Sequence, residues 1–276
     1  MGLSVIYVSL KPSPNTRDHQ TCAYRYRSEH LTTTIPAAAR AELTPTAKLR
    51  AGINFQNTLL TSLGPNGEPG GVAVDLVREL ARRLDVPLEI LHYQSAGALA
   101  DSVNSGAWDV AVLADEPARA KEIAFAGATT EIEATYMVPA GSPLQKIDDV
   151  DRPGVRIALG AKSAYDLYLT RTIQHAQLVP IAGSPAAFKH FVAEKLEALA
   201  GLKTELLKCA AELPGSRILD GRFTVVRHTA GTPRGRDAGA AYLCAFVEDV
   251  KAEGLVTQWI ANSGVQGLSV APKAGL

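Results

Sequence analysis

The chain reads Leu49-Arg-Ala-Gly-Ile-Asn54 and then, after a loop rich in Gly and Pro, Val72-Ala-Val-Asp-Leu-Val-Arg-Glu-Leu-Ala-Arg-Arg-Leu84. The first stretch is a short apolar run, which predicts a buried strand over 49–53. In the second stretch the apolar residues recur at helical spacing on one face, while three arginines and a glutamate take the opposite face. This pattern predicts an amphipathic helix over 72–84. A buried strand followed by such a helix is the beginning of a βαβ unit.

The alternation of strands and helices continues along the chain in two series. Because strands joined by helical crossovers lie parallel in one sheet, we expect an α/β fold with parallel strands. Two series within 276 residues indicate two lobes. The further predicted elements are strands at 88–91, 108–113, 155–159, 178–181 and 223–226, helices at 96–105, 164–174 and 185–194, and two helices around Gly254.

The composition excludes several classes of protein. The chain has 28 Lys and Arg against 28 Asp and Glu, so it lacks the basic excess that is typical of nucleic-acid binding. With 46% apolar and 20% charged residues it can fill a core, in contrast to disordered chains. No apolar run reaches the ~18 residues of a membrane-spanning helix. We therefore expect a globular protein without a nucleic-acid partner.

The first 46 residues differ from the rest of the chain. They carry four prolines and no sustained apolar period, which predicts a loosely ordered extension at 1–46. The apolar stretch at 3–10 is short and no Lys or Arg precedes it, so it does not fit a secretory signal. As written, the chain is expected to stay inside the cell.

The familiar motifs for metal binding, phosphate binding and covalent catalysis are missing from the sequence. The six histidines show no metal-ligand spacing, and there is no GxSxG, Walker A or HExxH pattern. Cys22, Cys209 and Cys244 are widely spaced without a CxxC pair, and we interpret them as ordinary thiols. The sequence thus predicts no metal, no cofactor and no catalytic residue, although Asp115 and Glu116 are available as acids.

Six stretches, in the same order, carry a resemblance to one family. The stretch from Glu116 to Phe125 is the most specific of the six. They are Leu49–Asn54, Gly71-Val-Ala-Val-Asp75, Trp108-Asp109-Val-Ala-Val, Glu116-Pro-Ala-Arg119-Ala-Lys-Glu-Ile-Ala-Phe125, Asp151-Arg-Pro-Gly154-Val-Arg-Ile-Ala and Phe246-Val-Glu-Asp-Val-Lys-Ala-Glu-Gly254-Leu-Val. Over residues 48–264 the chain resembles the family 3 extracellular solute-binding proteins, the receptors of polar amino-acid ABC transporters.

This resemblance implies a type 2 periplasmic-binding-protein-like fold, in which a two-strand hinge joins two α/β lobes and a solute binds in the cleft between them. Lobe 1 would comprise 47–133 and 226–276, and lobe 2 would comprise 134–225. The chain would cross between the lobes near 132–138 and 222–228. The resemblance also implies a non-catalytic binding protein, a periplasmic location and the membrane subunits of an ABC transporter as partners. We expect a monomer.

Arg119 is the first candidate for a ligand contact. In the family the matching arginine clamps the carboxylate of the ligand, because a guanidinium offers a planar fork of donors that fits two carboxylate oxygens. Without the surrounding motif, an exposed arginine in a short helix would be the simpler interpretation.

Four further residues are candidate ligand contacts. Asn54 ends the first strand at the sheet edge where ligands bind in α/β folds, or else it forms a turn. Asn57 falls where many relatives carry an aromatic side chain, which suggests a more polar pocket wall. Ser163 is a candidate helix cap, at a helix start whose free N–H groups favour an anion. Lys162 beside it either adds positive charge or points to solvent.

Two positions depart from the family pattern. Relatives carry an aspartate that receives the ammonium group of the ligand where this chain has Leu202. The stretch that contacts the carboxylate in relatives is replaced by Leu113-Ala114-Asp115. Since an unpaired buried ammonium is costly, either Asp115 or Glu116 replaces the missing carboxylate, or the ligand is not a standard α-amino acid.

Two other functions stay open at this stage. One is an enzyme on the same fold, of the cyclohexadienyl dehydratase type, which would need a proton donor or base in the cleft. The other is an intracellular small-molecule sensor, which the missing secretory signal favours. The sequence does not identify the ligand.

Overall fold

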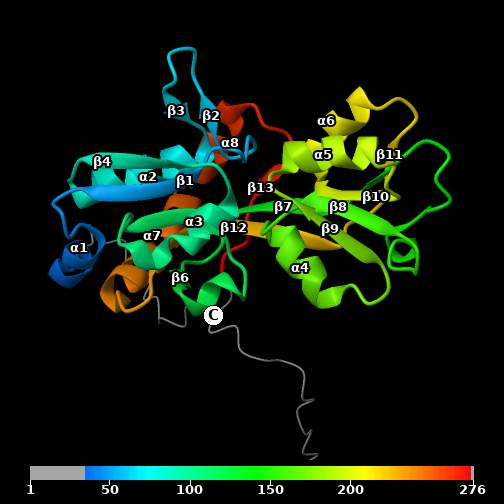
Figure 1. Ribbon diagram of the computed structural model, residues 1–276. Coiled ribbons are helices and arrows are strands. Elements are labelled where there is room, and N and C mark those ends of the chain that lie inside the picture. Colours follow the sequence, from blue (N-terminus) through cyan, green and yellow to red (C-terminus); the bar gives the residue numbers. More distant parts are fainter. Residues whose placement is uncertain (1–34, 275–276) are drawn as a thin grey trace, which may run out of the picture.

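The computed structural model describes residues 35–274, and within that range one mixed sheet runs through the molecule (Figure 1). Its strands are β1 (Leu49–Asn54), β4 (Leu88–Tyr93), β5 (Val110–Ala114), β6 (Ile123–Phe125), β7 (Thr130–Val138), β8 (Arg156–Gly160), β9 (Gln177–Ile181), β10 (Ala198–Leu202), β11 (Arg217–Ile218), β12 (Thr224–Pro233) and β13 (Leu268–Val270). A separate hairpin pairs β2 (Ser62–Leu63) with β3 (Pro69–Gly70).

Helices cover both halves of this sheet. They are α1 (Ala37–Leu43), α2 (Val72–Leu84), α3 (Ala96–Asp101), α4 (Ala164–Thr172), α5 (Ser184–Ala193), α6 (Lys203–Glu212), α7 (Asp237–Ala252) and α8 (Leu255–Ser263), with short 3₁₀ turns η1 (Val103–Ser105), η2 (Arg119–Lys121) and η3 (Ile147–Asp149). Figure 1 shows α1, α2, α3, α7 and α8 on the first half, and α4, α5 and α6 on the second.

The first half of the sheet has the predicted parallel strands. β1 lies between β4 and β5 and is parallel to both, with Leu49 opposite Leu88 and Ala51 opposite Val110. The short apolar runs of the sequence therefore form adjacent strands, of which β1 and β5 are mostly buried and β4, at the edge of the sheet, is partly exposed.

Helix α2 has the predicted bounds and buries the predicted face. Leu76, Leu80 and Leu84 are at most 1% exposed. The helix follows Gly71, whose φ is 94° and whose hypothetical Cβ would lie 2.6 Å from the carbonyl oxygen of Leu60. Only glycine fits here without strain, and it brings the start of the helix against the turn that follows β1.

The second half of the sheet is a smaller unit of the same kind. β8 is parallel to β9 and to β10, and α5 packs against these strands. A core that includes Met137, Phe191 and Leu199 lies beneath α5 and α6. β10, β11 and α6 are additions to the predicted elements, whereas β8, β9, α4 and α5 agree with the prediction within two residues.

Strands β7 and β12 belong to both halves. They lie antiparallel to each other, with Thr224 opposite Ala134 and His228 opposite Thr130. β12 also pairs with β5 of the first half, and β7 also pairs with β10 and β11 of the second. We propose that these strands are the hinge between a lobe 1 of residues 47–133 and 226–276 and a lobe 2 of residues 134–225.

Helix α1 departs from the prediction of a loosely ordered segment at 1–46. Ala39 and Leu43 are fully buried, and Glu42 accepts hydrogen bonds from Arg236 and Gly239 at the start of α7. The prediction is wrong for Ala37–Leu43, because so short a helix owes its order to tertiary contacts rather than to a readable period. Residues 1–34 lie outside the described residues.

The cysteines also differ in part from their interpretation as ordinary thiols. Cys209 is a free thiol in α6, whereas Cys244 in α7 is disulfide-bonded. The wide spacing of the cysteines along the chain gave no sign of a pairing. Cys22 lies outside the described residues.

Candidate functional site

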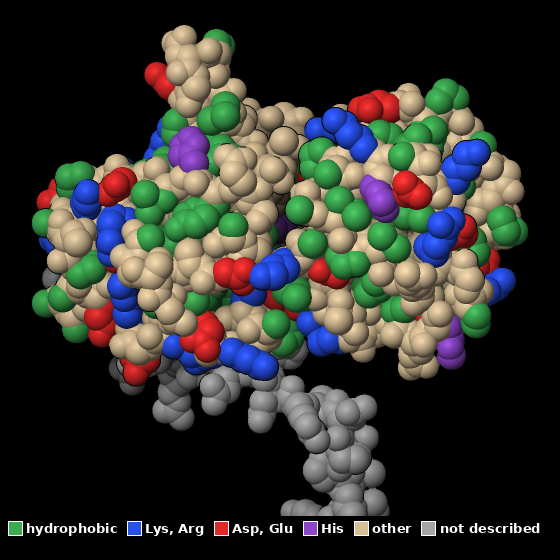
Figure 2. Space-filling view, in the orientation of Figure 1, with side chains coloured by type: hydrophobic (Ala, Val, Ile, Leu, Met, Phe, Trp, Pro, Cys, Tyr) green, Lys and Arg blue, Asp and Glu red, His purple; other side chains and the backbone are tan. Residues whose placement is uncertain are grey.

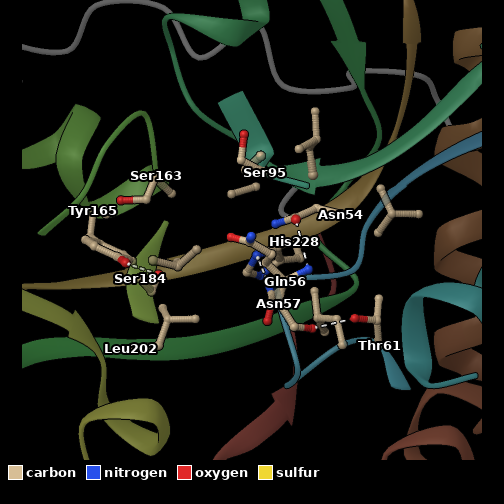
Figure 3. Close-up of a pocket in the computed structure, with 18 of the residues that line it drawn as sticks. Asn54, Gln56, Asn57, Thr61, Ser95, Ser163, Tyr165, Ser184, Leu202 and His228 are labelled. Carbon is tan, nitrogen blue, oxygen red and sulfur yellow. Dashed lines mark hydrogen bonds between the residues drawn. The ribbon is translucent and has the colours of Figure 1, made fainter. Parts of the chain in front are cut away.

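A cavity lies between the two lobes, at the ends of the strands where α/β sheets bind ligands (Figures 2 and 3). Lobe 1 lines it with the turn after β1, the start of α3, the end of β5, η2 and β12. Lobe 2 lines it with the end of β8, the starts of α4 and α5, the end of β10 and the first turn of α6. Figure 3 shows that polar side chains gather here from both lobes.

Arg119 lines this cavity and is only 6% exposed. Its guanidinium donates to the carbonyl oxygen of Ala114 at 3.2 Å and to that of Lys162 at 2.9 Å, which lie in different lobes. Burial lowers the pKa of Arg119 to about 10, so it stays a cation at neutral pH. Among the described residues no carboxylate forms an ion pair with it, since nearby Glu116 pairs with Arg171. The remaining N–H groups are free to meet an anion.

Three other predicted contacts also line the cavity. Ser163 caps α4 by accepting from the N–H of Asp166 at 3.1 Å, as predicted. Asn54 accepts from the N–H of Gln56 at 3.1 Å, which is the alternative role of a turn residue. Asn57 accepts from the N–H of Leu59 at 3.2 Å and turns its amide nitrogen toward His228. Each of these side chains thus holds the local backbone and also borders the cavity.

Lys162 and Asp115 are not among the residues that line the cavity. The ammonium of Lys162 reaches across to Asp101 of α3, with 2.5 Å between the paired atoms, at the rim of the cleft. The N–H of Asp115 is bonded to the carbonyl oxygen of Arg227. Lys162 has a left-handed backbone with a φ of 55°, and the next residue, Ser163, does line the cavity. This placement does not support the predicted contacts of Lys162 and Asp115 with a ligand.

Glu205 is the carboxylate that the sequence analysis missed. It lies in the first turn of α6, one helical turn after Leu202, and both residues line the cavity. Within the described residues its carboxylate has neither an ion pair nor a hydrogen bond, and burial raises its pKa to about 7. Its only sequence signal is its position just after the strand end at Leu202.

His228 is a second missed residue, and it comes from the hinge strand β12. It is 8% exposed and lines the cavity, with Nε2 3.3 Å from the amide nitrogen of Asn57. Burial, and to a lesser extent the charge of Arg119, lower the pKa of His228 to about 3, so the ring is neutral. Its Nδ1 is buried and has no hydrogen-bond partner. The sequence offers little signal for it, since β12 reads Thr-Val-Val-Arg-His-Thr-Ala-Gly-Thr-Pro and carries other polar residues as well.

A hydroxyl pair lies on the lobe 2 wall. The Tyr165 hydroxyl and Ser184 Oγ are 2.9 Å apart, and both residues line the cavity. Burial raises the pKa of Tyr165 to about 12, so the phenol is neutral. In Figure 3 this pair lies on the opposite side of the cavity from Asn54 and Asn57.

The rim of the cleft is crossed by bonds between the lobes. Arg171 of α4 forms an ion pair with Glu116 at 2.8 Å, and Lys162 forms one with Asp101. Together with the bond from Arg119 to the Lys162 carbonyl, these contacts hold the two lobes against each other around the cavity.

Residues 35–274 show no sign of a membrane-spanning helix or of a metal site. No helix there combines the length and the apolar character needed to cross a bilayer. In the same range, no three His, Cys, Asp or Glu side chains are grouped so that they could hold a metal ion.

Two α/β lobes, two shared strands and a cavity between the lobes define a two-lobe periplasmic-binding-protein-like fold. The sequence model of the bacterial extracellular solute-binding proteins, family 3, matches residues 49–262, and the chain belongs to this family. Among curated proteins, none matches the chain.

Solved structures of low sequence identity share the fold. A mutant of ArgBP from T. maritima is 19% identical, with a TM-score of 0.68 over 82% of this chain and 99% of that one. The solute receptor for L-cysteine of Neisseria gonorrhoeae is 17% identical, with a TM-score of 0.71 over 83% and 95%. The ancestral amino acid-binding protein AncCDT-1, a precursor of cyclohexadienyl dehydratase, is 17% identical, with a TM-score of 0.67 over 81% and 98%.

Proposed function

We propose that this chain is a non-catalytic receptor that closes around a small, amino-acid-like solute with a carboxylate group. The observation that carries the proposal is the buried guanidinium of Arg119, which lines a cavity between two lobes and has no anionic partner among the described residues. A buried cation without a counterion is costly, and a bound carboxylate would relieve that cost. The similar proteins named above that bind amino acids support this class of solute.

Glu205 supports a cationic group at another point of the same solute. Among the described residues that line the cavity, it is the one carboxylate and Arg119 is the one permanent cation. Opposite charges on two parts of one cavity match a zwitterion. Relatives carry an aspartate that receives the ammonium group of the ligand, and this chain has Leu202 at that position. Glu205 would perform the same role here, for which the sequence had suggested Asp115 or Glu116.

Closure of the lobes is part of the proposal, and so is delivery of the solute to the membrane subunits of an ABC transporter. The rim contacts of Glu116 with Arg171 and of Lys162 with Asp101 support a closed form. A solute that contacts both lobes would add to these contacts and shift the population toward closure.

An enzyme is the second candidate, and one observation favours it. Glu205 has a pKa raised to about 7 and lies in the cavity, which suits a general acid or base. One structural neighbour is a precursor of cyclohexadienyl dehydratase. A receptor returns its solute unchanged, whereas a dehydratase consumes it.

Thermal unfolding in the presence of a solute panel tests the proposed function. The panel contains the twenty amino acids, small dicarboxylates and prephenate. A solute present at 100 times its Kd should stabilise the chain by about 2.7 kcal/mol, which raises Tm by several degrees. We expect at least one zwitterionic member to do so and to be recovered intact. If no member raises Tm, the chain does not bind this class of solute.

The rim pair of Glu116 and Arg171 gives a separate prediction. Glu116→Gln should favour the open form by about 0.5–1 kcal/mol, because a partly exposed ion pair contributes little more than that. Small-angle X-ray scattering should then give a larger radius of gyration than for the wild type. Glu197→Gln is the matched control, since its ion pair with Arg156 lies within lobe 2. Equal radii for all three chains would contradict a role of this pair in closure.

A further inference from the structure

We propose that His228 presents its Nδ1–H to the solute as a second hydrogen-bond donor beside Arg119, in a tautomer that Asn57 fixes. The inference rests on the proposed function and adds a residue that determines which solutes fit. The group it would recognise is an anionic oxygen.

The contact with Asn57 determines the tautomer of His228. The side-chain oxygen of Asn57 accepts from the N–H of Leu59 at 3.2 Å, which leaves the amide nitrogen facing His228 Nε2 at 3.3 Å. An amide nitrogen can only donate, so Nε2 must accept. A neutral imidazole carries one proton, and that proton is therefore on Nδ1.

The Nδ1–H donor of His228 has no acceptor among the described residues, and Nδ1 is buried. A buried donor without a partner costs free energy, and such groups are rare in folded proteins. His228 lines the cavity, so a solute held there can supply the missing acceptor.

His228 lies near the guanidinium of Arg119, because both residues are neighbours of Ala114. His228 lies directly opposite Ala114 in the pairing of β12 with β5. The carbonyl oxygen of Ala114 accepts from Arg119 at 3.2 Å. A neutral donor next to a fixed cation favours an anionic oxygen and disfavours an ammonium group.

Thr130 is the competing partner within the chain. It faces His228 across the pair of β7 and β12, and its Oγ1 is likewise buried without a hydrogen-bond partner. If a rearrangement brought these two groups together, His228 would have only a structural role. Thr130→Val removes this acceptor with little change of volume, and solute affinity should then stay unchanged.

The binding experiment compares three replacements of His228 and Asn57 against the panel of amino acids and dicarboxylates. His228→Asn places an amide nitrogen near the position of Nδ1 and should keep affinity within about threefold of wild type. His228→Leu removes the donor and should weaken binding about 10- to 100-fold. Asn57→Asp can only accept, so it should move the proton to Nε2 and weaken binding although the imidazole remains. Tm without solute shows whether each variant is folded.

Nitrogen-15 NMR of the histidine rings in the wild-type chain without solute reads the tautomer directly. We expect His228 of the wild type to be neutral with the proton on Nδ1. In Asn57→Asp we expect the proton on Nε2 and none on Nδ1. A proton on Nε2 in the wild type would overturn the inference whatever the chain binds. Equal solute affinity of His228→Leu and wild type would also overturn it while leaving the proposed function intact. If no panel member binds to the wild type, the proposed function fails together with the inference.

Discussion

Arg119→Ala is expected to remove most of the stabilisation of the chain by its solute. Arg119 is the one permanent cation among the described residues that line the cavity, and it is almost completely buried. Removing one partner of a buried charge pair costs about 2–5 kcal/mol, which weakens binding at least about 30-fold. Isothermal titration calorimetry with the best member of the solute panel measures this loss.

A stability control must accompany this variant. Arg119 also bonds to the carbonyl oxygens of Ala114 and Lys162, so its loss lowers Tm without solute as well. Arg119→Lys keeps a cation but lacks the planar fork of donors, and we expect an intermediate affinity. Arg234→Ala is the matched control, because Arg234 likewise donates to a carbonyl oxygen, that of Ala120, but is exposed. Wild-type affinity in Arg119→Ala would remove this residue from the site.

Glu205→Gln is the second substitution with a large expected effect. It should weaken a zwitterionic solute about 10- to 100-fold, because the ammonium group loses the one carboxylate in the cavity lining of the described residues. A dicarboxylate should bind no worse, since it has no cation to lose. Calorimetry of both kinds of solute separates the two cases. An unchanged affinity for the zwitterion would show that Glu205 does not meet its cation.

The pH dependence of wild-type binding should follow the ionisation of Glu205. Its pKa is about 7 in the folded chain, so a cationic solute should bind about tenfold more weakly at pH 6 than at pH 8. The pKa values of Tyr165 and Cys209 are raised to about 12 and 11, and that of His228 is lowered to about 3. These neighbours therefore do not titrate in this window. Glu205→Gln should bind with the same affinity at both pH values.

The same group also affects the stability of the chain without solute. Between pH 4.5 and 7 the folded chain keeps on Glu205 a proton that the unfolded chain releases. The free energy of unfolding should therefore fall as pH rises through this window, by on the order of 2–3 kcal/mol. Urea unfolding at pH 5 and pH 8 measures the fall, and Glu205→Gln should show less of it. An equal fall of the free energy of unfolding in the wild type and in Glu205→Gln would contradict the raised pKa.

The parts of the fold that could be predicted are those in which a local pattern matches the final burial. Helix α2 is such a case, since its apolar spacing coincides with the face that is buried against the sheet. Strand β10 (Ala198–Leu202) is fully buried but consists of small residues, a glycine and two leucines, and it carries no strong strand signal. Helix α1 is ordered by its contacts with α7, which lies almost 200 residues away.

The residues of the candidate site also fall into those that the sequence predicted and those that it did not. Arg119, Asn54, Asn57 and Ser163 were found because each belongs to a motif or follows a predicted strand, and all four line the cavity. His228 could not be found in this way, since its neighbours are set by strand pairing and by an asparagine 171 residues away in sequence. Lys162 follows a strand as well, but its side chain forms an ion pair with Asp101 and does not line the cavity.

Equilibrium dialysis of the wild-type chain against a mixture of isotope-labelled amino acids, followed by mass spectrometry of the retained material, tests the central claim most directly. We predict that one amino acid or a small group is retained at one molecule per chain, is recovered chemically unchanged, and is lost from Arg119→Ala. Retention of no amino acid, or recovery of a converted product, would contradict the account of this chain as a receptor for an amino-acid-like solute.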